Sequence, residues 1–517
     1  MVSTKGVIER GAEDICCCLG HNCSMQVSPD LDVLIIGAGI TGIGVACQLE
    51  RNLPDKSYAI LESRERLGGT WDLFRYPGIR SDVDMYTFGY SFNPWRDPVA
   101  IAEGEAIRGY LGETADRFGV TDNIRFGHSV TSADWSSENS MWTVKALDAS
   151  TGESVTLTAR WIFSATGYFR YDHGHTPEFA GIEDFAGTVI HPQKWPQELD
   201  YSGKRVVVIG SGATAVTLIP SMAGTAEHVT MLQRSPTYVI PTPKRDPVVM
   251  FFSRFLSPDR VYAIARRKSI FTQEMVWNMS KKRPNLVRKW IIKTVTKQLP
   301  EGYDVDKHFT PKYNPWDQRL CVVPGGDMFR AIRKGTASVV TDQIDHFTAN
   351  GILLKSGEEL PADIVVTATG LDLLALGGVE FSTDGAPVEI SQTITYKGMM
   401  LSDLPNLMCS FPYPHVAWTI RVEVVAEYFQ RVLEYMDKTG RDTCVAVNSD
   451  PNLKTHPFGD YTSNYVLRAK HLFPQSGDRE PWDLDLKLRR DAKALRTAAV
   501  EDGTLSFSRS AGSASTR

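Results

Sequence analysis

Two stretches of the chain share one order of apolar and polar positions. Each opens with a short run of apolar, mostly β-branched residues, reaches a glycine-rich turn, and continues with apolar residues at helical spacing. The first stretch begins DVLIIGAG at Asp32, and the second begins KRVVVIGSG at Lys204. A second apolar run follows each helix, SYAILE ending at Glu62 and HVTMLQR ending at Arg234. The pattern predicts two βαβ units and therefore an α/β fold class.

The first turn, Gly37-Ala38-Gly39-Ile40-Thr41-Gly42, matches G-x-G-x-x-G between a strand and a helix, and Glu62 follows about 25 residues later. Gly37 permits the tight turn, Gly39 lets a pyrophosphate approach the backbone, and Gly42 lets helix and strand pack closely. Glu62 can accept hydrogen bonds from the hydroxyls of an unphosphorylated ribose. The turn therefore predicts an FAD site, and Glu62 argues against a glycine-rich turn without a ligand.

The second turn, Gly210-Ser211-Gly212-Ala213-Thr214-Ala215, has Ala215 as its third small residue, which the fingerprint permits. The strand after it ends in Gln233-Arg234-Ser235, so Arg234 stands where the first unit has an acid. A guanidinium holds a ribose 2′-phosphate that a carboxylate would repel. The second turn therefore predicts NADP, unless Arg234 is an ordinary surface residue.

We predict two Rossmann-like dinucleotide-binding domains, one for FAD and one for NADPH, with a helical insert in the NADPH domain. The segments WIFSATG and ADIVVTATG both end in Ala-Thr-Gly, which suggests that each block returns the chain to a shared sheet by the same kind of strand. We expect a disordered extension at 1–30 and a tail at 501–517. The FAD domain is expected in two parts, 31–170 and 345–500, and the second range opens with the closing strand of the NADPH domain. The NADPH domain is expected at 171–344, with its helical insert at about 246–312.

Composition narrows the class of protein. Of 517 residues, 42% are apolar and 23% are charged, with a net charge of −5, which gives no indication of a nucleic-acid partner. No apolar run of about 18 residues exists, so we expect no membrane-spanning helix. Cys47, Cys321, Cys409 and Cys444 are expected to be buried thiols of a cytoplasmic protein. The other four cysteines lie in the N-terminal extension, and no metal site is expected.

Two strings between the turns carry further information. The first comprises Gly68, Gly69, Thr70, Trp71, Tyr76, Pro77, Gly78 and Asp82. It describes a glycine-rich loop past the ribose strand, with an aromatic residue able to lie against a flat ring and a carboxylate beside it. The second comprises Phe185, Gly187, His191, Trp195 and Pro196.

These strings resemble two motifs of the type I Baeyer–Villiger monooxygenases, G-G-x-W-x4-[FY]-P-G-x3-D and F-x-G-x3-H-x3-W-P. The resemblance covers about residues 31–500. It implies that NADPH reduces FAD, that O₂ adds to the reduced flavin as a C4a-peroxide, and that this peroxide converts a ketone to an ester or lactone. Sulfoxidation of thioethers is implied as a side activity. Stabilising the developing negative charge requires a fixed cation.

The resemblance also implies roles for individual residues. Arg319 would supply the catalytic cation, and Asp82 would pair with it and hold it over the flavin. Gln318 stands where the family often has Lys, which puts a charge contribution to NADP binding at this position in doubt. His191 is expected to serve domain motion rather than to act as a general base. The remaining cofactor contacts would be Thr41, Thr70, Trp71 and Val130 for FAD, and Arg80, Ser211, Thr214, Ala215 and Ser235 for NADP.

Residues 244–297 combine many Lys and Arg residues with interleaved apolar and aromatic residues such as Phe251, Phe255 and Trp290. A basic amphipathic helix can lie on an anionic membrane surface. The competing interpretation is a helical insert whose apolar stripe packs on the NADPH domain. The sequence leaves both interpretations open, and it does not determine the oligomeric state.

Other functions remain to be weighed against ketone oxygenation. The same machinery would serve an enzyme that mainly oxygenates S or N atoms or long-chain hydrocarbons. A flavin disulfide reductase would need a redox cysteine pair, and no C-x-x-C occurs in the catalytic body. A nucleotide-binding sensor without turnover is disfavoured by Arg319 and Asp82. The expected partners are O₂ and a small ketone or thioether.

Overall fold

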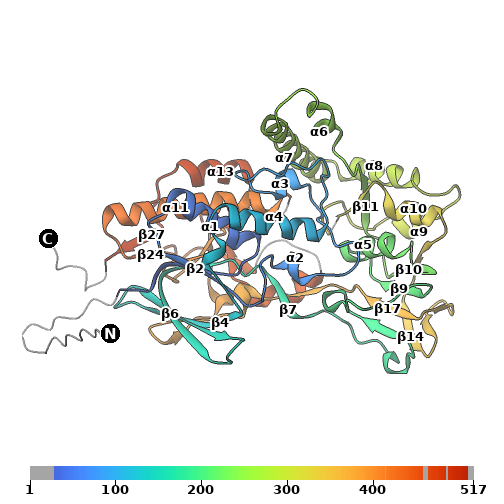
Figure 1. Cartoon of the computed structure of the whole chain (residues 1–517), viewed down its shortest axis with the longest axis horizontal. Coiled ribbons are helices and arrows are strands. Elements are labelled where there is room, and N and C mark those ends of the chain that lie inside the picture. The colour runs from blue at the N-terminus through green and yellow to red at the C-terminus, as the bar shows by residue number, and fades with distance from the viewer. Residues whose placement is uncertain (1–27, 319, 414, 458–463, 485–486, 510–517) are drawn as a thin grey trace, which may run out of the picture.

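The computed structural model describes residues 28–318, 320–413, 415–457, 464–484 and 487–509 (Figure 1). Most of the N-terminal extension, with its four cysteines, lies outside these residues. The predicted boundary of the C-terminal tail is wrong, because β27 (Leu505–Ser508) pairs antiparallel with β24 (Thr443–Ala446). Leu505 is buried and Ser506 exposed, so this short strand alternates as an edge strand does, and its serine-rich composition concealed it.

The first unit is built on a mixed sheet with nine described strands. Its parallel part consists, in spatial order, of β23 (Leu407–Met408), β6 (Ser154–Ser164), β1 (Leu31–Ile36), β2 (Tyr58–Glu62) and β3 (Ile124–Phe126). The sheet continues from β6 through β5 (Met141–Asp148), β4 (His128–Ser136), β19 (Glu380–Thr383) and β20 (Ala386–Pro387). The strand-to-helix pattern predicted for the first block is therefore present.

Both faces of the first sheet are covered, which explains why β1 is apolar at nearly every position. Val33 and Ile35 pack under α1 (Ile40–Asn52), α4 (Gly104–Arg117) and α11 (Trp418–Thr439). Leu34 and Ile36 face the opposite core, which contains Trp135 and Trp142 of the antiparallel strands. Figure 1 shows α1 and α11 side by side above this sheet.

The second unit has a sheet whose described strands are all parallel. In spatial order they are β13 (Ala337–Thr341), β10 (His228–Gln233), β9 (Arg205–Ile209), β17 (Ile364–Thr367) and β8 (Thr188–Ile190). Helices α5 (Ala213–Met222) and α10 (Asp327–Arg333) cover one face. The other face packs on the small antiparallel sheet of β14 (Ile344–Thr348), β15 (Gly351–Leu354) and β16 (Glu359–Pro361).

The prediction of a shared sheet is wrong. WIFSATG is the end of β6 in the first sheet, and ADIVVTATG is β17 in the second. The strands that follow, β7 (Phe169–Gly174) and β18 (Leu371–Leu373), pair antiparallel as a two-stranded connector between the units. The repeated Ala-Thr-Gly has a local cause instead. A Cβ on Gly37 would lie 2.8 Å from the Ala165 carbonyl oxygen, and one on Gly210 would lie 2.3 Å from that of Ala368.

The predicted insert consists of helices. They are α6 (Pro247–Phe252), α7 (Pro258–Lys282), α8 (Pro284–Thr296) and α9 (Val305–Phe309). Proline occupies the first position of α6, α7 and α8, where its missing N–H costs no hydrogen bond. Figure 1 shows α6 and α7 projecting from the body of the molecule. No helix in the described part of the chain is long and apolar enough to cross a bilayer.

Candidate active site

One cavity of about 1590 Å³ extends across both units. Residues of the first turn line one part of it, and Ala213 and Thr214 of the second turn line another. The inner face of α7 contributes Gln273, Val276 and Trp277. The cavity therefore joins the two dinucleotide-binding turns and the helical insert in a single space.

The first turn forms a cradle that only glycine permits. Gly37 has a φ of 105°, which L side chains rarely adopt. A Cβ on Gly42 would lie 1.9 Å from the Gly37 carbonyl oxygen, so helix α1 can begin here only without a side chain. The backbone amides at the start of α1 remain available to a phosphate. The cradle fits a dinucleotide pyrophosphate.

Glu62 ends β2 directly beside this turn. Its Oε2 accepts a hydrogen bond of 2.8 Å from the Ala38 N–H, and its Oε1 accepts one of 3.0 Å from the Arg64 N–H. The residue is 4% exposed and lines the cavity. Burial raises its pKa, and the two backbone hydrogen bonds counteract that shift. A buried carboxylate that also holds the turn is well placed to receive ribose hydroxyls.

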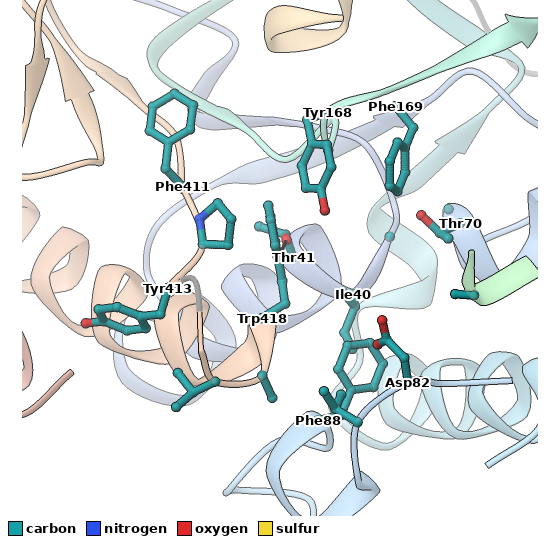
Figure 2. A pocket seen from close by; sticks show the side chains of 18 of the residues that line it. Ile40, Thr41, Thr70, Asp82, Phe88, Tyr168, Phe169, Phe411, Tyr413 and Trp418 are labelled. Atoms are coloured by element: carbon teal, nitrogen blue, oxygen red, sulfur yellow. Dashed lines mark hydrogen bonds between the residues drawn. The ribbon is translucent and has the colours of Figure 1, made fainter. Parts of the chain in front are cut away.

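The structure brings most of the residues expected around FAD to this cavity. The lining includes Gly37, Gly39, Thr41, Glu62, Thr70, Trp71, Asp82 and Val130, whereas Gly42 lies behind the turn. The Trp418 indole N–H donates a hydrogen bond of 2.6 Å to the Thr41 hydroxyl, which ties the start of α11 to the turn (Figure 2). Figure 2 shows the Asp82 and Thr70 side chains in the same pocket. Arg319, the expected catalytic cation, lies outside the described residues.

The residues expected around NADP are more dispersed. Thr214, Arg80 and Gln318 line the cavity. The Ser211 hydroxyl lies 2.7 Å from the Thr237 hydroxyl and 3.4 Å from the Ser235 carbonyl oxygen, so the turn meets the end of β10. Gly210, Ser211, Gly212, Ala215, Arg234 and Ser235 lie beyond the lining of the cavity, and Arg234 and Ser235 are exposed. The expected 2′-phosphate position is thus at the surface.

Arg80 connects the two units. Its guanidinium lies 2.5 Å from a carboxylate oxygen of Asp327, the first residue of α10. The side chain is 12% exposed. This ion pair links the segment around the first string to helix α10 of the second unit.

The fingerprint residues lie outside the lining of the cavity, and His191 lies at the connector. His191 Nδ1 accepts a hydrogen bond of 3.2 Å from the Gln193 N–H, and its Nε2 lies 3.2 Å from the Gly370 carbonyl oxygen. A Cβ on Gly174 would lie 2.0 Å from this ring, so the ring packs directly on β7. Burial lowers the pKa of His191. Phe185 is buried in the core and Gly187 meets the Asp363 carbonyl, while Trp195, followed by Pro196, packs on the second core.

Sequence and structure comparisons agree with this geometry. The flavin-binding monooxygenase-like family matches residues 31–375. The chain belongs to this family. It is 50% identical over 480 residues to the FAD-containing monooxygenase EthA of Mycobacterium tuberculosis, covering 93% of this chain and 98% of that protein. It is 47% identical to the probable FAD-binding monooxygenase AlmA of Acinetobacter baylyi, covering 92% and 96%.

Among solved structures, a steroid monooxygenase bound to NADP matches with a TM-score of 0.74 at 22% identity, covering 93% of this chain and 99% of that one. OTEMO in complex with FAD and NADP matches with a TM-score of 0.74 at 21% identity, covering 93% and 100%. The predicted fold class is confirmed, and so is the predicted enzyme class of flavoprotein monooxygenase. Both predicted cofactors, FAD and NADP, are present in the OTEMO complex.

In this flavin monooxygenase, the far end of the cavity is aromatic, and sequence motifs did not reveal it. Trp277 of α7 stacks on His415 at a centroid distance of 5.2 Å and meets the edge of Trp316 at 5.7 Å. The three residues come from distant segments, and all line the cavity. Trp316 Nε1 and His415 Nδ1 are buried and have no hydrogen-bond partner among the described residues. Burial lowers the pKa of His415, which keeps its imidazole neutral.

A buried aspartate behind the first string was also missed. Asp72 of α2 (Thr70–Leu73) is 2% exposed, and its carboxylate is 2.7 Å from Arg64 and 2.8 Å from Arg75. Arg66 approaches it at 3.3 Å. In the sequence, the only signal for this cluster is that Arg64, Arg66 and Arg75 lie within a few residues of Asp72. It fixes α2, and with it Thr70 and Trp71, against the cavity.

Proposed function

We propose that the enzyme inserts one oxygen atom of O₂ beside the carbonyl of a ketone, which gives an ester or a lactone. The observation that carries the proposal is the aromatic end of the cavity. Trp277, Trp316 and His415 line this end, and the buried Trp316 Nε1 and His415 Nδ1 have no hydrogen-bond partner among the described residues. A buried polar atom without a partner costs free energy, and a substrate oxygen or nitrogen can supply the missing hydrogen bond.

The cofactors supply the redox chemistry: bound FAD, reduced by NADPH, activates O₂ for transfer to the substrate. The chain supplies the binding sites. The cradle at Gly37 and Gly39 and the Glu62 carboxylate hold the first dinucleotide, and the surface at Arg234 and Ser235 holds the 2′-phosphate of the second.

We assign the substrate-orienting donor to Trp316. Its indole N–H can only donate, so it suits a carbonyl oxygen, on which negative charge develops as the carbonyl carbon is attacked. His415 stacks beside it and stays neutral. In this proposal Asp82 orients Arg319, and the charge of Arg319 stabilises the same developing negative charge.

Thioethers are the second proposed substrate class. A thioether has no carbonyl group, so its oxygenation needs no hydrogen-bond donor to polarise one. The apolar walls at Trp277 and Val276 accept the substituents on its sulfur atom. The oxygenation of ketones should therefore depend on Trp316 more strongly than the oxygenation of thioethers.

The test uses FAD-loaded protein with NADPH and a panel of linear, cyclic and aryl ketones plus one thioether, with products identified by mass spectrometry. We expect ketone-dependent NADPH consumption and ester or lactone products. Trp316→Phe, which keeps an aromatic ring and removes the donor, should lower kcat/KM for ketones about tenfold, the effect of one lost hydrogen bond. It should leave thioether oxygenation nearly unchanged. Stoichiometric hydrogen peroxide release without stimulation by any ketone would overturn the proposal.

We further propose that the enzyme works in the cytoplasm and touches a membrane peripherally. The four described cysteines are buried and form no disulfide among the described residues, as expected for a reducing compartment. Residues 244–297 are the segment proposed for the membrane contact.

A further inference from the structure

The helical insert carries an unusual concentration of exposed apolar side chains. Twelve large apolar residues are exposed in the described part of the chain, and eight of them lie between residues 250 and 290. We call these eight the apolar patch: Met250, Phe251, Phe255, Phe271, Met275, Met279, Leu286 and Trp290. Phe255 is 73% exposed. Isolated exposed apolar residues are ordinary, but a cluster of this kind marks an interaction surface.

Helix α7 carries buried apolar residues in its first half and exposed apolar residues in its second half. Val261, Tyr262 and Ala265 are buried against the body of the protein. Phe271, Met275 and Met279, spaced by four residues, form a stripe on the exposed side. The inward face accounts for the packing of the insert, which was one of the two interpretations of the sequence. The outward stripe needs a different explanation.

Exposed basic residues alternate along the chain with the residues of the apolar patch. The exposed side chains Arg254, Arg260, Arg267, Lys282, Arg283, Lys289 and Lys293 form no ion pair with any described residue. The three acids of residues 244–297 are already engaged, Asp246 with Lys268, Asp259 with Arg96 and Glu274 with Arg489. The insert therefore combines exposed apolar side chains with an excess of positive charge that no described acid neutralises. Charge of this sign complements anionic lipid headgroups, and the apolar side chains can enter the boundary of the acyl region.

The apolar patch adjoins the cavity. Gln273, Val276 and Trp277 on the inner side of α7 line the cavity, while Met275 and Met279 on the same helix belong to the patch. Trp290 does both, since it is 51% exposed and lines the cavity. A side chain with one side in solvent and the other in the cavity marks the rim of an opening. Figure 1 shows α6 and α7 as the part of the molecule that extends farthest on this side.

We propose that the apolar patch seats the enzyme on an anionic bilayer and that the cavity opens at Trp290 toward that bilayer. The opening admits substrates that partition into lipid, such as long-chain ketones, without passage through water. This inference develops the peripheral membrane contact proposed above, and it rests on the proposed ketone oxygenation only for the identity of the substrate. A second copy of the chain is a poorer occupant, because a two-fold contact would place two positively charged inserts against each other.

The first experiment measures docking. Holoenzyme is centrifuged with sucrose-loaded vesicles of phosphatidylcholine alone or of phosphatidylcholine and phosphatidylglycerol in equal amounts. We expect binding to the anionic vesicles that weakens as salt rises. The double variant Phe255→Ser/Phe271→Ser should lower the partition coefficient more than about tenfold, because two aromatic anchors are lost. Leu147→Ser is the matched control, since Leu147 is 46% exposed on β5 of the other unit, and it should leave binding unchanged.

The second experiment tests the opening. A long-chain ketone embedded in anionic vesicles should be turned over several-fold more slowly by Phe255→Ser/Phe271→Ser, whereas a short water-soluble ketone should be turned over equally by both proteins. The docking proposal is overturned if wild-type protein stays in the supernatant at low salt, or if Leu147→Ser loses binding equally. If the wild-type protein elutes as a dimer in gel filtration and the double variant elutes as a monomer, the apolar patch is a self-association surface and the docking proposal is overturned. Docking with no turnover of any ketone would overturn the proposed function and leave the docking intact.

Discussion

The two glycine-rich turns have the same backbone geometry and different surroundings. Gly37 and Gly210 both have positive φ, 105° and 132°, and each lies against the carbonyl of an Ala-Thr-Gly segment. The first turn is enclosed, since Glu62 is 4% exposed and is hydrogen-bonded to it. The second is open, and Arg234 is exposed. One fingerprint thus makes a closed cradle, which suits a resident cofactor, and an open one, which suits a cofactor that must exchange.

The largest expected effect comes from Gly42→Ala. The added Cβ would lie 1.9 Å from the Gly37 carbonyl oxygen, and backbone cannot move aside as a side chain can. We expect loss of bound FAD and a free energy of unfolding that is lower by about 1–3 kcal/mol. Flavin absorbance after purification and the thermal unfolding of the protein measure the two effects.

Gly212→Ala is the contrasting change in the second turn, at the position that corresponds to Gly39 of the first. A Cβ there meets no atom within 4 Å, so the protein should fold and keep its flavin. The methyl group would instead stand where the NADP pyrophosphate approaches, and KM for NADPH should rise. Equal loss of flavin in both variants would contradict the contrast between the two turns.

Asp82→Asn should have the next largest effect. The variant keeps the shape and removes the negative charge that is proposed to hold Arg319, so kcat should fall about 10–100-fold. FAD content should stay normal, because the cradle at Gly37 is untouched. Stopped-flow measurement of each half-reaction separates the steps. A variant with normal kcat would show that Asp82 is a binding residue only.

Arg234→Gln probes the open site. Loss of the guanidinium should raise KM for NADPH about tenfold or more, since a charge-assisted hydrogen bond contributes about 1.5–3 kcal/mol. KM for NADH should hardly change, because NADH has no 2′-phosphate. Arg234→Lys should keep part of the preference for NADPH over NADH, because its side chain is still positively charged. An equal rise for both nucleotides would rule out the assigned role.

The smallest effect is expected at the connector between the two regions. Burial lowers the pKa of His191 from its ordinary value of 6.5, so the unfolded chain binds the proton over a range where the folded one does not. The contribution of His191 to the free energy of unfolding is therefore fully present above a pH of about 6.5, and it is lost as the pH falls below that value. We expect Tm to fall by a few degrees on acidification, and less in His191→Gln. An identical pH dependence in both proteins would remove His191 as the cause.

Local patterns predicted the elements and the turns, because a βαβ unit forms from residues close together in sequence. They did not predict which sheet each returning strand joins. The identical Ala-Thr-Gly endings reflect the close approach of Gly37 to Ala165 and of Gly210 to Ala368, and not one common sheet. A contact between residues more than 100 positions apart leaves no periodic signal in a single sequence.

The sequence by itself determined the two dinucleotide-binding turns, the acid at Glu62 and the basic helical segment. Only the tertiary structure decided which residues enclose the cavity, since Trp277, Trp316 and His415 meet from three separate segments. It also decided that the stripe from Phe271 to Met279 faces solvent. The physical reason is the same in both cases. Helical periodicity shows that apolar residues share a face, but burial depends on what packs against that face, and distant parts of the chain supply it.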